Sequence, residues 1–288
     1  MAIVMRAREA ADALYEEIRS ETKTIKEQGA VPHVSVILVE GDPASAYYAE
    51  AKRKVAERLG ISYKLHTFEQ TAAQEEILTL IEALNADPNV HGIMVELPLP
   101  AHISTAAVEQ TVSPLKDIDG VTPANKLATM TGAPGLYPAT PQACIKLAKH
   151  YGYSLEGVNV ALIGRGQTVG LPLFHMLQRE NATVTLCHSR TPDIAFHLSH
   201  ADIAFVAVGR PGIVQSGMVH SRLALIDAGI NETASGAIVG DVAPDAAEHA
   251  AALSPVPGGV GTLTTAVLFE NLLKAIKLQT AVKEADQA

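Results

Sequence analysis

Five short apolar segments in the second half of the chain constrain its fold most strongly. They read VNVALIG (158–164), ATVTLCH (182–188), ADIAFVAVG (201–209), LALIDAG (223–229) and AIVGDV (237–242), and each ends in small or polar residues. Short buried strands that alternate with helical stretches are typical of βαβ units, whose strands form a largely parallel sheet. We therefore expect an α/β domain in this part of the chain.

The first half of the chain shows the same alternation. Helices are expected over 6–28, 45–59 and 74–84, and strands over 33–39, 61–68 and 92–95. The proline- and glycine-rich segment 97–141 lacks this periodicity, so we expect loops there, along a cleft between two domains. A last helix is expected over 263–278, folded back on the first domain. The length of 288 residues suits two domains.

The charge of the chain limits its partners. With 31 acidic and 22 basic side chains the formal charge is -9, whereas nucleic-acid binding needs a basic face. We find no run of 18 apolar residues and no signal-peptide pattern. We therefore expect a cytoplasmic protein that binds neither nucleic acid nor membrane. The 11 histidines show no compact ligand spacing, so a metal-dependent hydrolase is disfavoured and no metal site is predicted.

The segment VNVALIGRGQTVGLP gives the first chemical signal. A strand that ends at Gly164 is followed by Gly166 and Gly170 and then by a helix. Glycine in such a turn lets the backbone approach a pyrophosphate, which the amino-terminal end of the helix attracts. The spacing GxGxxxG is one residue longer than the common GxGxxG, so a turn that binds no ligand remains an alternative.

The end of the next predicted strand indicates which dinucleotide is expected. Sites for NAD usually place an acidic residue there to bind the ribose 2′-hydroxyl, but this chain has Ser189 and Arg190 in CHSRT. A hydroxyl and a guanidinium suit a 2′-phosphate, and Arg165 in the first turn could bind the same group. We therefore predict NADP as the cofactor. His188 either shapes the adenosine pocket or has a purely structural role.

Further motifs follow one another along the chain. They are GDPAS with Tyr48 and Lys52, VELPLP, PLKDIDGVTPAN, YPATP, GRGQTVGLP, CHSRT, AVGRP, IDAGIN, GDV and PVPGGVGTLT. In this order they resemble the methylenetetrahydrofolate dehydrogenase/methenyltetrahydrofolate cyclohydrolase family over nearly the whole chain. The resemblance implies an N-terminal α/β folate-binding (catalytic) domain of residues 1–139 plus 266–288. It also implies a Rossmann-like NADP-binding domain of residues 140–265, with the active-site cleft between the two.

The resemblance implies two reactions. Hydride passes from 5,10-methylenetetrahydrofolate to NADP+, and water then opens the methenyl product to 10-formyltetrahydrofolate. Lys52 would be the acid and base of the second step, Tyr48 would stack on the folate ring system, and Asp119 would accept hydrogen bonds from the pterin edge. With Glu96, these residues form the expected catalytic set.

The resemblance also implies the residues that line the ligands. Pro257, Gly258 and Gly259 would join Tyr48 and Asp119 at the substrate. The expected cofactor contacts are Gly164, Arg165, Gly166, Thr168, Val169, Gly170, His188, Ser189, Arg190, Gly209 and Ile230. A tetrahydrofolate derivative as substrate, a homodimer, and a role in one-carbon metabolism and purine biosynthesis are further implications.

Glu96 departs from the family pattern, in which Gln precedes LPLP and hydrogen-bonds to the lysine. A carboxylate near Lys52 would stabilise its ammonium form at the expense of the neutral amine that a general base needs. We therefore expect the dehydrogenase to survive and the hydrolysis to be weakened or lost. Two other interpretations stay open: Glu96 itself acts as the base, or solvent screens the pair. A fully bifunctional enzyme is thus the alternative, and a non-catalytic NADP-binding protein is a further one.

Overall fold

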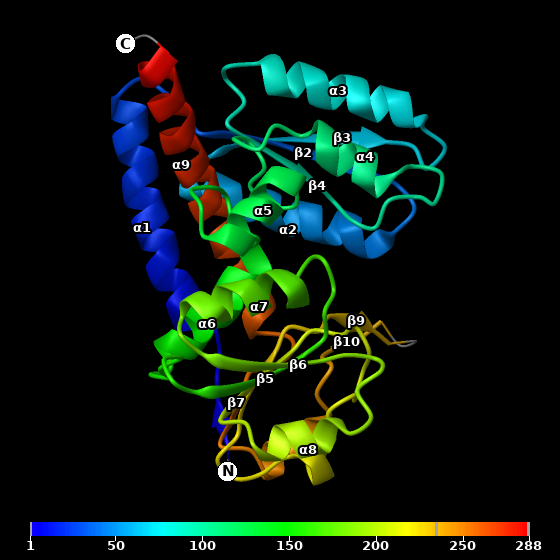
Figure 1. Ribbon diagram of the computed structural model, residues 1–288. Coiled ribbons are helices and arrows are strands. Elements are labelled where there is room, and N and C mark those ends of the chain that lie inside the picture. The colour runs from blue at the N-terminus through cyan, green and yellow to red at the C-terminus, as the bar shows by residue number, and fades with distance from the viewer. Residues whose placement is uncertain (1, 234–235, 287–288) are drawn as a thin grey trace. The chain divides into compact units, whose positions relative to one another are not determined.

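The computed structural model describes residues 2–233 and 236–286 (Figure 1). The chain forms two compact units. The three-stranded unit comprises Leu14–Ala128, Ala133–Tyr137 and Leu268–Ala288, and the six-stranded unit comprises Met1–Ala13, Thr129–Gly132 and Pro138–Val267. The main sheet of each unit is parallel and covered by helices, which confirms the predicted α/β class. Of the predicted folate-binding range, residues 1 and 287–288 lie outside the described residues.

The three-stranded unit is built from nine elements, of which α1, α5 and α9 cross the division between the units. They are α1 (Arg8–Glu27), β2 (His33–Val39), α2 (Pro43–Leu59), β3 (Ser62–Phe68), α3 (Gln74–Ala86), β4 (Gly92–Val95), α4 (Thr105–Thr111), α5 (Pro123–Thr131) and α9 (Val260–Asp286). The strand order is β3-β2-β4. Ile37, Val39 and Ile93 share one apolar cluster with residues of α3 and α4, so these two helices cover the same face of the sheet.

The segment 97–141, which we expected to form loops, contains the helices α4 and α5. The hydroxyl of Ser104 accepts a hydrogen bond from Ala107 N and caps α4. Pro123 begins α5, where its missing N–H costs no helical hydrogen bond. The expectation was wrong because helices of seven and nine residues are too short to show a clear period.

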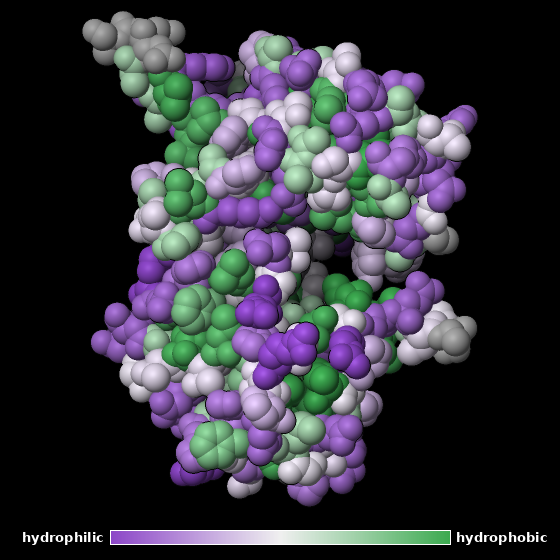
Figure 2. All heavy atoms as spheres, turned by 45° about the vertical axis from the view of Figure 1, so that its right-hand side comes forward, coloured by the Kyte–Doolittle hydropathy of each residue, from purple (hydrophilic) through white to green (hydrophobic). Residues whose placement is uncertain are grey.

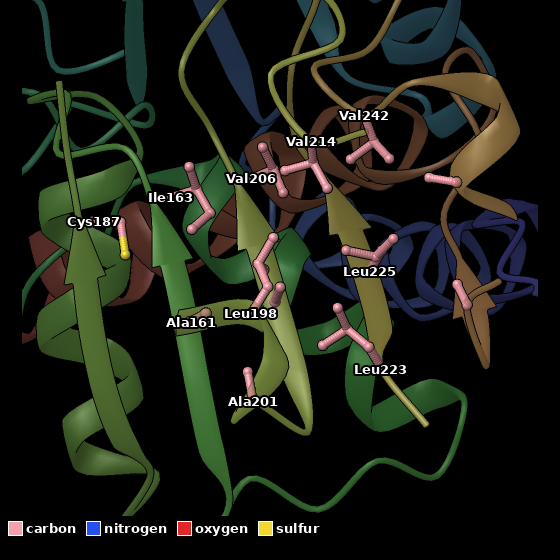
Figure 3. Close-up of a cluster of buried hydrophobic side chains, with 13 residues drawn as sticks. Ala161, Ile163, Cys187, Leu198, Ala201, Val206, Val214, Leu223, Leu225 and Val242 are labelled. Carbon is pink, nitrogen blue, oxygen red and sulfur yellow. The ribbon is translucent and has the colours of Figure 1, made fainter. Parts of the chain in front are cut away.

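The six-stranded unit holds the five apolar segments. Its elements are β1 (Ile3–Val4), α6 (Ala139–His150), β5 (Asn159–Ile163), α7 (Gly170–Arg179), β6 (Thr183–Cys187), α8 (Ile194–Ser199), β7 (Ile203–Val206), η1 (Ser216–Met218), β8 (Ala224–Asp227), β9 (Asn231–Glu232), β10 (Ile238–Val239), η2 (Pro244–Glu248) and β11 (Ala252–Leu253). The sheet order is β1-β11-β8-β7-β5-β6. Figure 3 shows Ile163, Val206 and Leu225 in the apolar cluster that these parallel strands form with α8.

One predicted strand of this series lies outside the parallel sheet. The segment AIVGDV contributes only β10, which pairs antiparallel with β9 in a separate ribbon. The place beside β8 is taken by β11, and β1 pairs with β11 at the edge of the sheet. Neither β1 nor β11 was expected, because a strand of two residues has no detectable alternation.

The surface of the protein is mixed in character. Figure 2 shows hydrophilic and hydrophobic residues interspersed over one face of the molecule. Within the ranges that the structure describes, every helix is either too short or too polar to cross a lipid bilayer.

Candidate active site

The motif GDPAS fixes the start of α2 next to the end of β4. The carboxylate of Asp42 caps the helix by accepting hydrogen bonds from Ala44 N and Ser45 N at 3.4 and 3.1 Å. The hydroxyl of Ser45 contacts this carboxylate at 2.7 Å and lies 3.1 Å from the carbonyl oxygen of Leu97. The helix is therefore tied to the residue that follows Glu96, and its first turns lie at the carboxyl end of β4.

Lys52 and Glu96 form an ion pair within the three-stranded unit. The Lys52 ammonium donates to both carboxylate oxygens of Glu96, at 2.7 and 2.8 Å. The Lys52 side chain is 16% exposed and that of Glu96 is 7% exposed. Because both groups are largely removed from water, solvent screens their attraction only weakly. The predicted proximity of these two residues is therefore seen in the structure.

The loop after residue 115 is held by Asp117 rather than by Asp119. The carboxylate of Asp117 accepts hydrogen bonds from Val121 N, Thr122 N and the Asn125 side chain at 2.8–3.1 Å. Asp117 is 1% exposed, and its carboxylate serves the turn. The carboxylate of Asp119, the second acid of the KDIDG motif, takes no part in these hydrogen bonds.

Asp119 is half-buried, and no hydrogen bond to its carboxylate occurs among the described residues. Burial raises the pKa of Asp119 to about 6, with smaller contributions from the negative charges of Asp117, Glu96 and Glu109. The nearby Lys52 ammonium acts in the opposite direction. A desolvated carboxylate without an internal partner is typical of a ligand-binding position.

Tyr48 lies one helical turn before Lys52 on α2 and is half-buried. Its ring makes an edge-to-face contact with Tyr47, with 5.7 Å between the ring centroids. The hydroxyl of Tyr63 on β3 donates to the carbonyl oxygen of Ala49 at 2.9 Å and so anchors the same stretch of α2 to the sheet. The three-stranded unit thus brings Tyr48, Lys52, Glu96 and Asp119 to the carboxyl end of its sheet.

In the six-stranded unit, the direction in which the chain adds strands reverses between β5 and β7. The chain runs from β5 to β6 on one side and then returns to β7 on the other side. Ligands of doubly wound sheets bind at the carboxyl ends of strands at such a switch point. A side chain at Gly164 would collide with the carbonyl of Ala207 after β7, and one at Gly170 would collide with the carbonyl of Gly164.

These collisions explain two of the three glycines in the turn. A side chain at Gly166 would meet no protein atom within 4 Å, so the fold itself does not require glycine there. Arg165 and Thr168 are exposed, and Val169 is half-buried immediately before α7. The turn therefore presents backbone and polar side chains at the amino-terminal end of a helix, which suits a phosphate group.

The CHSRT segment follows β6 directly beside this turn, since Ile163 pairs with Cys187. Thr191 closes it, because its hydroxyl accepts from His188 N at 2.9 Å. Nδ1 of His188 accepts from Arg190 N at 3.1 Å, which gives His188 a structural role in placing Arg190. The side chains of Ser189 and Arg190 are exposed, and no acidic residue ends the strand.

Asp241 holds the loop after β7, a role that we did not predict. Its carboxylate accepts from three successive backbone groups, Val208 N, Gly209 N and Arg210 N, at 2.6, 2.9 and 2.8 Å. It also accepts from the Asn231 side chain at 2.9 Å. Asp241 is fully buried. The GDV motif carries this acid, but sequence alone does not show which backbone groups a buried carboxylate will meet.

A second buried acid, Asp227, holds the backbone around Asp241 in place. The carboxylate of Asp227 accepts from Gly229 N, Asp241 N and Val242 N at 2.8–3.1 Å. A side chain at Gly229 would collide with Asp241, and one at Gly240 would collide with Asp227. The glycines of IDAGIN and GDV are therefore required by close packing against these two carboxylates.

The remaining predicted residues lie in the six-stranded unit. Ile230 lies in the loop between β8 and β9, and its side chain is 52% exposed. Pro257, Gly258 and Gly259 form a turn before α9, in which the carbonyl of Gly258 accepts from Ala7 N at 2.9 Å. A side chain at Gly259 would crowd the carbonyl of Pro255, so glycine is required there by packing.

Comparison with known proteins assigns both parts of the chain. Residues 5–119 match the model of the tetrahydrofolate dehydrogenase/cyclohydrolase catalytic domain, and residues 138–280 match that of the NAD(P)-binding domain. The chain belongs to the tetrahydrofolate dehydrogenase/cyclohydrolase family. The predicted family is therefore confirmed.

Individual relatives agree with this assignment. The bifunctional protein FolD of Heliobacterium modesticaldum is 52% identical over 91% of this chain and 92% of its own length. The bifunctional FolD dehydrogenase/cyclohydrolase structure from Campylobacter jejuni has a TM-score of 0.93 at 36% identity and covers 97% of this chain and 100% of its own. The Trypanosoma brucei FolD structure, which contains NADP and an inhibitor, has a TM-score of 0.91 at 33% identity, with 97% and 98% covered.

Proposed function

We propose that this chain oxidises 5,10-methylenetetrahydrofolate to 5,10-methenyltetrahydrofolate with NADP+ and retains at most a weakened hydrolysis to 10-formyltetrahydrofolate. The observation that carries the proposal is the constellation of Lys52, Glu96 and Asp119 at one end of the three-stranded sheet. In this constellation Lys52 can exchange a proton with the substrate or with water. The desolvated carboxylate of Asp119 can bind the N–H groups along the edge of a ring.

Each side chain has a distinct part in this proposal. Asp119 binds the amino and ring N–H groups of the pterin, because its carboxylate has no hydrogen-bond partner among the described residues. The half-buried ring of Tyr48 offers a flat surface for the folate ring system. Lys52 delivers and removes protons during hydrolysis. Pro257, Gly258 and Gly259 supply backbone on the substrate side.

NADP is the cofactor, and the residues of the six-stranded unit suit it. When bound, it supplies a nicotinamide ring that accepts the hydride. The turn over Gly164, Arg165, Gly166, Thr168, Val169 and Gly170 would hold the pyrophosphate. Ser189 and Arg190, placed by His188, would bind the 2′-phosphate. Gly209 and Ile230 are proposed to contact the cofactor from the loops after β7 and β8.

Glu96 is proposed to restrain the second reaction. Its two short contacts engage the Lys52 ammonium, and an ammonium cannot accept a proton from water. Hydride transfer needs no such base, because the two nitrogens that flank the methylene carbon stabilise the resulting cation. The two activities should therefore separate in this chain.

A fully bifunctional enzyme is the second candidate. The relatives in Heliobacterium modesticaldum and Desulfitobacterium hafniense, 52% and 48% identical, are both named bifunctional. In that case the Glu96 carboxylate would accept the proton itself, with Lys52 as its acid partner.

The proposal is tested with the purified protein. NADP+-dependent oxidation of 5,10-methylenetetrahydrofolate is followed for the native chain, for Lys52→Met and for the control Lys54→Met, which changes an exposed lysine of the same helix. We expect oxidation by all three proteins, and loss of any residual hydrolysis only in Lys52→Met. Absence of oxidation in the native chain would refute the proposed function.

Finer features are also proposals. We assign the family's catalytic domain to residues 1–139 plus 266–288 and its NADP-binding domain to residues 140–265. We propose a homodimer in the cytoplasm that supplies one-carbon units for purine biosynthesis. Two buried free thiols, Cys144 and Cys187, support a reducing compartment. Sedimentation analysis would test the dimer, and fractionation of cells would test the compartment.

A further inference from the structure

A second polar pocket lies in the three-stranded unit, at the opposite end of the sheet from Lys52 and Glu96. His33 and Ser62 begin β2 and β3, and His91 directly precedes β4, whereas Glu96 follows the carboxyl end of β4. Since β2 has seven residues, the two ends are on the order of 20 Å apart. We call this the histidine pocket. Its lining is Gly29, Ala30, Val31, His33, Ser35, Ser62, Lys64, Leu84, Asp87, Pro88, Asn89, Val90, His91, Ile276, Gln279, Thr280 and Lys283.

The pocket is large enough for an organic molecule. Its volume is about 650 Å³, within the roughly 300–1,000 Å³ typical of small-molecule sites. It is an open pocket bordered by the loop after α1, the amino ends of the strands, the loop after α3 and the last turns of α9. Figure 1 shows α1 and α9 side by side, and the ion pair of Lys277 with Glu21 at 2.7 Å joins them.

The imidazoles of the pocket are held in place by hydrogen bonds. The two ring nitrogens of His33 lie 2.8 Å from the Ser62 hydroxyl and 3.2 Å from the Ser35 hydroxyl. Nδ1 of His91 accepts from His33 N at 3.3 Å, and the carbonyl of His91 accepts from the Gln279 side chain at 2.8 Å. Because Nδ1 of His91 is an acceptor, neutral His91 carries its proton on Nε2 and offers a donor there.

These contacts determine the kind of ligand that the pocket suits. A metal ion needs free nitrogen lone pairs, but both nitrogens of His33 and Nδ1 of His91 are already engaged. The ammonium groups of Lys64 and Lys283 line the pocket and have no ion-pair partner among the side chains that the structure describes. Asp87 is the one acid in the lining. In a chain with a formal charge of -9, this is a local excess of donors and positive charge.

We propose that the histidine pocket binds a small organic or inorganic anion through phosphate or carboxylate oxygens. Lys64 and Lys283 supply the charge, while Nε2–H of His91 supplies a directed donor. The site is independent of the proposed catalytic function, since none of its lining residues belongs to the proposed active site.

Binding in this pocket should depend on pH. Burial lowers the pKa of His33, His66 and His91. Positive charge on Lys64, Lys116 and Lys283 lowers the pKa of one or more of these imidazoles, and His33 lowers that of His66 and His91. Asp87 raises the pKa of His33 and His91. An anion would oppose the effect of the lysines and favour the imidazolium form of His33, whose two ring nitrogens face hydroxyl oxygens that can accept, so its binding takes up protons. The affinity should therefore rise as pH falls from 8 to 6.

The test titrates the full-length protein with inorganic phosphate and, separately, with citrate at constant ionic strength. Imidazole NMR signals of His33 and His91, assigned with His33→Gln and His91→Gln, report occupancy. The double variant Lys64→Ala/Lys283→Ala is compared with Lys23→Ala/Lys54→Ala, which removes two exposed lysines elsewhere on the same unit.

We expect saturable shifts with the native protein, at least tenfold weaker binding in Lys64→Ala/Lys283→Ala and native binding in the control. Sulfate, whose charge is constant over this range, should bind more tightly at pH 6 than at pH 8. Saturation by phosphate alone would identify a phosphate-type ligand, and saturation by citrate alone a polycarboxylate; either supports the site. No saturable shift with either anion, or equal binding by both double variants, would overturn the proposal.

Discussion

Both carboxylate oxygens of Glu96 lie within 2.8 Å of the Lys52 ammonium, in a pair that is almost wholly removed from solvent. Solvent screening, one of the interpretations left open by the sequence, is therefore weak at this position. What remains is a choice between a lysine held in its protonated form and a carboxylate that has taken over as the base. These alternatives predict opposite effects when the charge of Glu96 is removed.

Folate binding should weaken in acid because of Asp119. Its pKa is raised to about 6 by burial, so the protein contains the protonated form below that pH. Ring N–H groups bind the ionised carboxylate, and KM for the folate should rise about tenfold per pH unit below 6. The measurement is KM between pH 5 and 8.

The matched variant is Asp119→Asn. It should have a KM for the folate about 10- to 100-fold above that of the native protein at pH 8, without the pH dependence below pH 6. A native protein whose KM is constant from pH 5 to 8 would contradict the role of Asp119. The raised pKa of Asp119 also affects stability. Because the folded-state pKa lies above the ordinary value, ionisation of Asp119 costs more in the folded than in the unfolded protein. The ligand-free protein should therefore lose stability as pH rises from about 4 to above 6.

Asp241→Asn should disturb the cofactor loop although the substitution is nearly isosteric. One oxygen of Asp241 accepts from Val208 N and Gly209 N, and the other from Arg210 N and Asn231. In either orientation of the introduced side-chain amide, its NH2 group would replace an oxygen that accepts two hydrogen bonds and would face two N–H donors. We expect a loss of roughly 2–5 kcal/mol in unfolding free energy and a higher KM for NADP, with the folate KM nearly unchanged.

Denaturant unfolding and steady-state kinetics measure these effects. The control is Asp245→Asn, since Asp245 is exposed in the same unit and, among the described residues, accepts only a hydroxyl hydrogen bond from Ser216, at 2.8 Å. It should behave like the native protein. An Asp241→Asn variant with native stability and native KM for NADP would show that the loop does not depend on this carboxylate.

Arg190→Ala should reduce the preference for NADP over NAD. An exposed guanidinium beside Ser189 suits a 2′-phosphate, which NADP carries and NAD lacks. We expect KM for NADP to rise about 10- to 100-fold, as for the loss of a charge-assisted hydrogen bond, while KM for NAD changes little. Arg222→Ala, an exposed arginine of the same unit, is the control. An equal effect on both cofactors would argue against recognition of the 2′-phosphate by Arg190.

Regular periodicity made much of the fold predictable from the sequence. Strands such as β2 and β5 consist mostly of apolar residues, and the expected helices over 45–59 and 74–84 correspond to α2 and α3. The two-residue strands β1 and β11 and the short helices α4 and α5 were missed because each is too brief for a period to emerge. Their positions are set by tertiary contacts.

The candidate site was predictable only where local patterns or family resemblance marked it. Lys52 and Glu96 were expected to meet, and they do. The hydrogen bonds of Asp241 could not be foreseen, because they join a buried carboxylate to backbone groups of another loop. The histidine pocket was missed for the same reason: His33, Ser62 and His91 become neighbours only when the strands pair.

The measurement that tests the central claim most directly is a paired assay of Glu96→Gln, the native chain and Glu57→Gln, an exposed carboxylate of α2. Oxidation of 5,10-methylenetetrahydrofolate and hydrolysis of 5,10-methenyltetrahydrofolate are measured on each preparation. We predict weak native hydrolysis that rises about 10- to 100-fold in Glu96→Gln, oxidation within about threefold in all three, and no change in Glu57→Gln. Strong native hydrolysis that Glu96→Gln leaves unchanged or abolishes would contradict the account.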